Sequence, residues 1–167
     1  MIMADVLLWT LIILGTYVVL IAYWVGAYAL FPARVERCRA VYGARPVAAT
    51  LVGLVILLPA LALGIGLSKA LPHPIVQTPV IGALLVLELV CLVGSAGLVL
   101  RIGAGMSSPL DATQPWRRSL RGGLVLGLAF VLPFLGWFVL LPWTLASGMG
   151  AFVLARKPPL ASREPLG

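Results

Sequence analysis

The feature that most constrains this chain is an uncharged apolar stretch from Gly122 to Ala155, 34 residues long and flanked on both sides by basic residues. One straight helix of that length would measure about 50 Å, whereas the hydrocarbon core of a bilayer is about 30 Å thick. Tilt alone would have to exceed the usual limit of about 40°. Proline breaks helices and glycine permits sharp turns. We therefore expect a helical hairpin that turns at Pro133, Gly136 and Trp137 and enters and leaves the membrane on one face.

Composition places the whole chain in a membrane. Of its 167 residues, 62% are hydrophobic and 10% are charged, which is too apolar for a soluble domain of this size. Three further apolar segments, at about residues 6–31, 46–68 and 79–100, are long enough to cross a bilayer. We predict an all-α integral membrane protein with three transmembrane helices and a C-terminal re-entrant hairpin, or four to five membrane-embedded helices. Residues 1–157 would form one polytopic domain, and residues 158–167 a short disordered cytoplasmic tail.

The distribution of Lys and Arg predicts the orientation. With the N-terminus outside, three crossings and a closing hairpin, 11 of the 12 basic side chains lie on the inner face and only Lys69 lies outside. A single crossing by the last segment would move Arg156, Lys157 and Arg163 outside. Because cytoplasmic loops carry the excess of Lys and Arg, this count selects the hairpin independently of its length. It predicts a multi-pass protein of the bacterial inner (plasma) membrane with a cytoplasmic C-terminus, and it explains the net charge of +7 without a nucleic-acid partner.

Two loops hold most of the arginines. Residues 33–45 include four arginines and one acid, and residues 101–121 include four arginines and Asp111. A short helix over residues 34–42 would lie on the headgroups, because arginine stems bury at the interface while their charges reach phosphate. A nucleic-acid-binding arm is the alternative. Contacts with anionic lipid or an acidic partner are predicted for Arg34, Arg37, Arg39, Arg117 and Arg118.

Glu88 lies near the centre of the third apolar segment. Cys91 and Ser95 follow at i+3 and i+7, which places all three on one helix face, and Tyr17 of the first segment lies at comparable depth. A charged carboxylate that faces lipid costs several kcal/mol, so Glu88 must be protonated, paired or turned toward the bundle. A protonated Glu88 would either hydrogen-bond between helices or belong to a proton-handling site.

The sequence contains no constellation that indicates a reaction. A Ser-His-Asp set, a pair of carboxylates and a metal-ligand spacing are all missing, and His73 is the single histidine. Cys38 and Cys91 fall in a basic loop and in a membrane segment respectively, so a disulfide between them is not expected. We predict that the protein is not an enzyme and holds no cofactor and no metal.

The order of features resembles a group of small bacterial multi-pass proteins, the membrane regions attached to or found near bactofilins. Bactofilins are polymer-forming β-helical cytoskeletal proteins. The residues that carry the resemblance are Leu30-Phe-Pro-Ala-Arg34-Val-Glu, Arg45-Pro46 and Leu132-Pro133-Phe-Leu-Gly136-Trp137. It covers roughly residues 30–157. This chain departs from the group in having only five residues before its first segment and a longer, more polar turn around His73. The resemblance implies a membrane-embedded scaffold or anchor, without catalytic residues.

Two functional hypotheses follow. The first is a non-enzymatic inner-membrane scaffold, anchor or accessory subunit. It would present basic cytoplasmic loops to anionic lipid and to a cytoskeletal or larger membrane-complex partner, as a monomer or an oligomer. The second is a small proton- or solute-handling membrane component that uses Glu88.

Overall fold

The computed structural model describes residues 2–70, 73–106, 108–111, 113–132 and 134–156, and throughout these ranges the regular elements are helices. They are α1 (Ile2–Leu30), α2 (Pro32–Ala44), α3 (Pro46–Ala70), α4 (Pro74–Gly105), the short 3-10 helix η1 (Pro109–Asp111), α5 (Trp116–Phe130), the π-helical η2 (Leu135–Leu140) and α6 (Leu141–Leu154). Four segments of the described chain are long and apolar enough to cross a membrane: Met3–Leu30, Pro46–Ala70, Pro74–Gly105 and Leu135–Leu154. The prediction of an all-α multi-pass membrane protein is confirmed. The tail at residues 158–167 lies outside the described residues.

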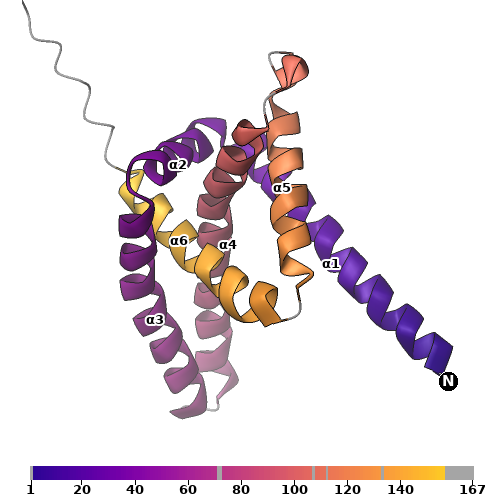
Figure 1. The fold of residues 1–167 in the computed structure, drawn as a ribbon. Coiled ribbons are helices and arrows are strands. Elements are labelled where there is room, and N and C mark those ends of the chain that lie inside the picture. Colours follow the sequence, from indigo (N-terminus) through magenta and orange to yellow (C-terminus); the bar gives the residue numbers. More distant parts are fainter. Residues whose placement is uncertain (1, 71–72, 107, 112, 133, 157–167) are drawn as a thin grey trace, which may run out of the picture.

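The last apolar stretch reverses direction rather than continuing as one helix. α5 ends at Phe130, η2 begins at Leu135, and α6 returns to the end of the molecule where α5 starts (Figure 1). The predicted turn residue Pro133 lies outside the described residues. The second limb, Leu135–Leu154, has 20 residues, which is longer than the fifteen or so expected for each limb. This limb is long enough to cross a bilayer by itself. The depth of the hairpin in the membrane stays a prediction.

Gly136 permits the turn because it has no side chain. The described glycines all have ordinary negative φ values, so no unusual backbone conformation is involved. A side chain at Gly136 would instead collide with the backbone carbonyl of Phe130, on the other limb. The Gly136 N–H donates to the Leu132 carbonyl at 2.8 Å. Trp137 points away from the packed interior and is 56% exposed.

α6 lies between α3 and α4 (Figure 1), and small residues allow this arrangement. A Cβ atom added at Gly150 would overlap the carbonyl of Ala49 on α3, and one added at Gly53 would overlap the carbonyl of Ala146. On the opposite side of α6, Gly148 lies against the α4 backbone at Cys91 in the same way. Ala146 and Gly150 thus form a close-approach surface of α6 against α3. Without a hydrophobic drive between helices in lipid, such backbone contacts supply much of the packing.

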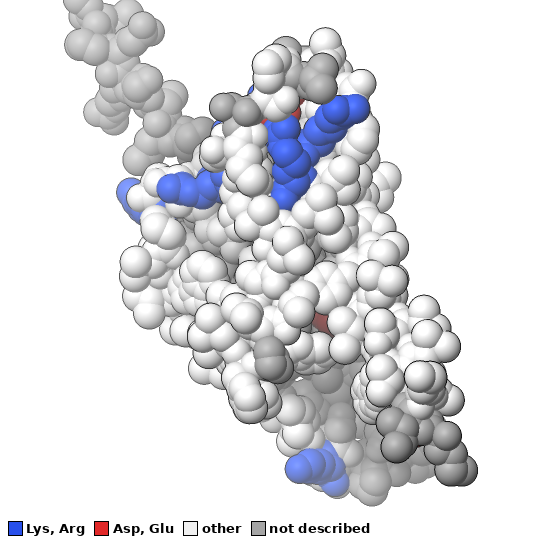
Figure 2. Space-filling view, turned by 45° about the vertical axis from the view of Figure 1, so that its right-hand side comes forward, with Lys and Arg blue, Asp and Glu red and all other residues white. Residues whose placement is uncertain are grey.

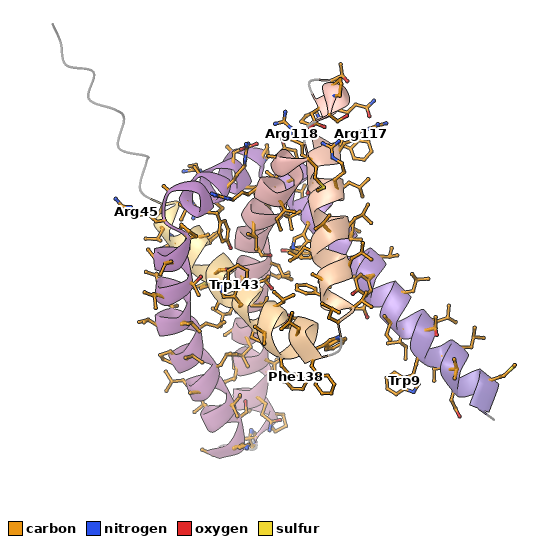
Figure 3. All side chains as sticks on the ribbon, in the orientation of Figure 1. Trp9, Arg45, Arg117, Arg118, Phe138 and Trp143 are labelled. Carbon is orange, nitrogen blue, oxygen red and sulfur yellow. The ribbon has the colours of Figure 1, made fainter. Side chains whose placement is uncertain are left out.

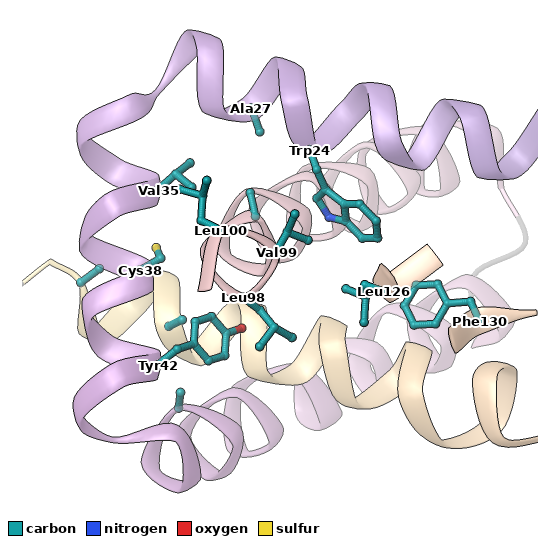
Figure 4. Packing of buried hydrophobic residues seen from close by; sticks show 14 residues of the cluster. Trp24, Ala27, Val35, Cys38, Tyr42, Leu98, Val99, Leu100, Leu126 and Phe130 are labelled. Atoms are coloured by element: carbon teal, nitrogen blue, oxygen red, sulfur yellow. The ribbon is translucent and has the colours of Figure 1, made fainter. Parts of the chain in front are cut away.

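Buried side chains gather where α2 crosses the end of α4 (Figure 4). On α2, Val35, Cys38 and Tyr42 are almost fully buried. They occur at i, i+3 and i+7, and therefore share one helix face. The predicted helix over residues 34–42 is present and two residues longer at each end. It packs against α4 and α6 through this face.

α1 packs along only half its length. From Tyr17 onward it contacts α4 and α5, and Trp24 is buried against Phe130. Its first half projects away from the bundle (Figures 1 and 3) and exposes apolar side chains, including Trp9. In a bilayer, lipid would cover this half.

α4 begins earlier than predicted. Its first residue is Pro74 rather than Pro79, and it continues past Arg101 to Gly105. Proline is well placed at a first helical position because its missing N–H has no partner there. His73 precedes it, and its Nδ1 accepts the Ile75 N–H at 3.4 Å. His73 is exposed and caps the start of α4.

Candidate functional sites at the basic end and at Glu88

Basic side chains collect at one end of the molecule. Of the ten Lys and Arg residues in the described chain, nine belong to α2, the end of α4, the start of α5 and the residues that directly follow α2 and α6. These elements meet at the same end (Figure 1), and Figure 2 shows the basic surface there with a smaller patch at the opposite end. The tenth, Lys69, lies in the last turn of α3. We call these nine side chains the basic end: Arg34, Arg37, Arg39, Arg45, Arg101, Arg117, Arg118, Arg121 and Arg156.

Asp111 fixes two of these arginines. Its carboxylate is only 6% exposed. Oδ2 accepts from Nη2 of Arg121 at 2.6 Å and from Nε of Arg118 at 3.3 Å. The Ser108 N–H also donates to it at 3.3 Å. Burial alone would raise the pKa of Asp111, but the hydrogen bond and charge of Arg121, with the Ser108 amide and Arg118, outweigh it and lower that pKa. The cluster ties η1 to the start of α5.

Arg34 joins α2 to α6. One Nη donates to the backbone carbonyl of Phe152 at 3.3 Å, and the guanidinium lies 4.1 Å from the centre of the Phe152 ring. Phe152 lies in the last turn of α6, where carbonyls have no partner within the helix. A cation there also interacts favourably with the helix dipole. Arg34 and Arg118 therefore have intrachain roles, and their predicted contacts with phosphate or an acidic partner stay predictions.

The other arginines differ in how they are held. Arg37 donates to the Ala33 carbonyl of its own helix at 3.1 Å, and Arg39 pairs with Glu36 at 3.0 Å. Arg117 lies 5.7 Å from the ring of Trp116. The side chains of Arg45 and Arg101 are exposed and make no hydrogen bond or ion pair to any described residue. Figure 3 shows Arg45, Arg117 and Arg118 around this end.

A cleft of about 440 Å³ opens between α2 and α4 at the basic end. It is lined by Glu36, Arg39, Ala40, Gly43, Arg101 and Ala104. Arg101 reaches it across Gly43, where a Cβ would come within 3.1 Å of the guanidinium. The sequence analysis did not single out Arg101, because this residue was interpreted as the end of the third apolar segment. Arg101 and the small residue Ala104 are three positions apart on a helix and so share one face. This spacing was the available signal for a surface that faces α2.

Glu88 lies in the middle of α4, 14 residues after Pro74 and 17 before Gly105. Its side chain is exposed and makes no hydrogen bond or ion pair within the described part of the chain. It lines a second cleft, of about 230 Å³, together with leucine and isoleucine side chains of α3 and α4, Cys91, and Leu145 of α6. The predicted partner Cys91 therefore shares a cleft with Glu88.

The other two predicted partners of Glu88 lie elsewhere. Ser95 is buried against α6, accepts from Nε1 of Trp24 at 3.1 Å and donates to the Leu92 carbonyl at 2.8 Å. Tyr17 packs its ring against Gly127 of α5, and its hydroxyl has no partner among the described residues. The helical spacing placed Ser95 correctly on the same face of α4 as Glu88. However, α6 covers this face at Cys91 and Ser95 and leaves Glu88 exposed.

Two further hydrogen bonds between helices, of which the first is buried, were not predicted. The hydroxyls of Tyr42 and Ser147 lie 3.1 Å apart, and Tyr23 donates to the Leu89 carbonyl at 3.1 Å. The i, i+3, i+7 spacing of Val35, Cys38 and Tyr42 was the available signal for the first, since it marks a buried face.

The thiol nearest to the basic end is not arranged as a nucleophile. Cys38 is fully buried, and burial raises its pKa to about 11 although Arg34 and Arg37 act in the opposite direction. It stays protonated at neutral pH, and a protonated thiol is a poor nucleophile. Within the described ranges, no three His, Cys, Asp or Glu side chains are grouped as metal ligands.

Comparisons with known proteins found no match to this chain among protein-family models, curated proteins or solved structures. The resemblance to membrane regions associated with bactofilins stays a prediction.

Proposed function

We propose that this multi-pass protein is a non-enzymatic scaffold, anchor or accessory subunit of the bacterial inner membrane. The observation that carries the proposal is the concentration of nine arginines at one end of an otherwise apolar bundle. By the excess of Lys and Arg in cytoplasmic loops, this end would face the cytoplasm. There it would meet the anionic surface of the inner leaflet and acidic surfaces of other proteins.

The contacts of the arginines support a division of roles. Arg34, Arg118 and Arg121 are held by groups within the chain and stabilise the basic end. Arg45 and Arg101 have no such contact among the described residues, and Arg37 is bound only to its own helix. Each basic group near an anionic bilayer surface contributes about 1 kcal/mol of attraction. These three exposed side chains, together with the exposed Arg156, would therefore supply most of the binding, and the intrachain set would position them.

The partner class follows from the charge and from the resemblance described above. A basic surface at the membrane suits an acidic partner, and we propose a cytoskeletal polymer or a larger membrane complex. The small size of the described loops fits an accessory role, because they hold no folded unit beyond the helical bundle.

The test is purification of the full chain from membranes in mild detergent, followed by identification of copurifying chains and lipids. A variant with Arg37→Gln, Arg45→Gln and Arg101→Gln should lose the partner and the enrichment of anionic lipid. Three contacts of about 1 kcal/mol each correspond to roughly a hundredfold weaker association. Lys69→Gln, at the opposite end, is the matched control and should behave as the wild type.

Two results would contradict the proposal. One is a wild-type protein that purifies alone and shows no preference for anionic over zwitterionic lipid. The other is a triple variant that keeps every partner and lipid of the wild type.

A further inference from the structure

The cleft at Glu88 combines an apolar lining with one carboxyl group. α3 contributes Leu57 and Leu61, α6 contributes Leu145, and α4 contributes the remaining residues. Glu88 is the only charged side chain in the lining, and Cys91 is the only other group that can titrate. Because the Glu88 side chain is exposed, a molecule can reach it from outside the bundle without the helices separating.

The bundle itself does not use Glu88 for packing. The neighbouring polar side chains are satisfied by one another or by backbone carbonyls: Trp24 with Ser95, Tyr42 with Ser147, and Tyr23 with Leu89. The described cations lie in the basic end and at Lys69. No described residue therefore neutralises the carboxylate.

We propose that this cleft binds a small apolar organic cation, such as a quaternary ammonium or a protonated amine with a hydrophobic substituent, with Glu88 as its counter-ion. The leucines would cover the apolar substituent and the carboxylate would face the charge. A volume of about 230 Å³ limits the ligand to one ring or a short branched chain.

The test uses benzyltrimethylammonium, a one-ring cation that has no proton to lose. Its binding to the full chain in neutral detergent is measured by titration calorimetry, and we expect one site. Neopentylbenzene replaces the nitrogen by carbon and has no charge, so it should bind at least about tenfold more weakly.

Two variants localise the site. Glu88→Gln should weaken binding of the cation at least about tenfold. Leu145→Trp should fill the cleft and prevent binding while the carboxyl group stays in place. Glu36→Gln, which removes an acid on α2 outside this cleft, is the control and should bind as the wild type. Binding unchanged in the first two variants, equal affinity for the cation and for neopentylbenzene, or no binding to the wild type would each overturn the proposal. If Glu88→Gln fails to fold, Leu145→Trp decides the question.

Discussion

Individual arginines at the basic end have different surroundings although they occur in similar loops of the sequence. Arg34 reaches a carbonyl 118 positions along the chain, and Arg121 reaches Asp111, ten positions away. Arg45 and Arg101 have no acceptor among the described residues. The sequence indicated that these side chains gather on one side. It could not divide them into intrachain and surface groups, because that division depends on acceptors brought close by tertiary packing.

The pairing of Asp111 with Arg121 and Arg118 should make local stability depend on pH. The pKa of Asp111 is lowered in the folded protein, so its stabilising effect is complete above the unfolded value of about 3.9. It is lost as the pH falls through the lower folded value. We expect Asp111→Asn to melt at a lower temperature than the wild type at pH 7, and the difference to shrink on acidification below pH 4.

Thermal unfolding in detergent between about pH 3 and pH 7 measures this difference. Glu36→Gln is a suitable control, because its pair with Arg39 is exposed and surface ion pairs contribute little. A difference between the wild type and Asp111→Asn that stays constant with pH would show that the carboxylate charge does not stabilise the fold.

At the scale of elements, hydropathy located each membrane segment but set some helix ends incorrectly. The apolar runs predicted α1, α3, α4 and the reversal between α5 and α6. The burial of α2 was missed, because its arginines conceal the apolar face formed by Val35, Cys38 and Tyr42. The start of α4 at Pro74 was missed because Pro79 was taken as its first residue. Proline can occupy either position, so composition alone could not choose between them.

The packing of α6 should depend on its glycines. In Gly150→Val, the new side chain would overlap the Ala49 carbonyl, and α3 would have to move away. We expect destabilisation of about 1–3 kcal/mol or more, which is typical of overpacking. Gly82→Val makes the same change on α4 where a Cβ meets no atom within 4 Å. Comparing the two variants therefore cancels the intrinsic difference in helix propensity between glycine and valine.

Unfolding of both variants in micelles, monitored by circular dichroism, gives the comparison. Equal stability of Gly150→Val and Gly82→Val would contradict the role of Gly150 in joining α3 to α6. A loss confined to Gly150→Val would support it.

The whole molecule gathers most of its buried residues near the basic end and is more loosely packed at the opposite end. α2 and the ends of α4, α5 and α6 pack around buried residues at the basic end (Figure 4). Toward the other end, α1 leaves the bundle and the lower halves of α3 and α4 expose leucine and valine (Figures 1 and 3). Glu88 could be singled out from the sequence by its depth. Its cleft could not, since the walls come from three helices whose neighbours were unknown.

The orientation of the molecule provides the final prediction. The charge asymmetry predicts that the basic end lies in the cytoplasm and that the N-terminus and Lys69 lie outside. Cys38 and Cys91 are both buried, so single thiols introduced elsewhere can be labelled over a low background. In cells, an impermeant maleimide should label Ala4→Cys and Lys69→Cys from outside. Ala44→Cys and Ala161→Cys should react only after the membrane is opened.

Ala161 decides between a hairpin and a single crossing. It lies beyond the described residues, after Arg156, so its side reports where the chain emerges from α6. The structure returns α6 to the end where α5 begins, and α2 lies at that same end. Ala161→Cys and Ala44→Cys should therefore share one side of the membrane, opposite Ala4→Cys. If Ala161→Cys and Ala4→Cys were both labelled from outside, α5 and α6 would have to follow one another in a single crossing of the membrane. That arrangement would separate Arg34 from Phe152, whose contact joins α2 to α6, and would contradict both the fold and the proposed orientation.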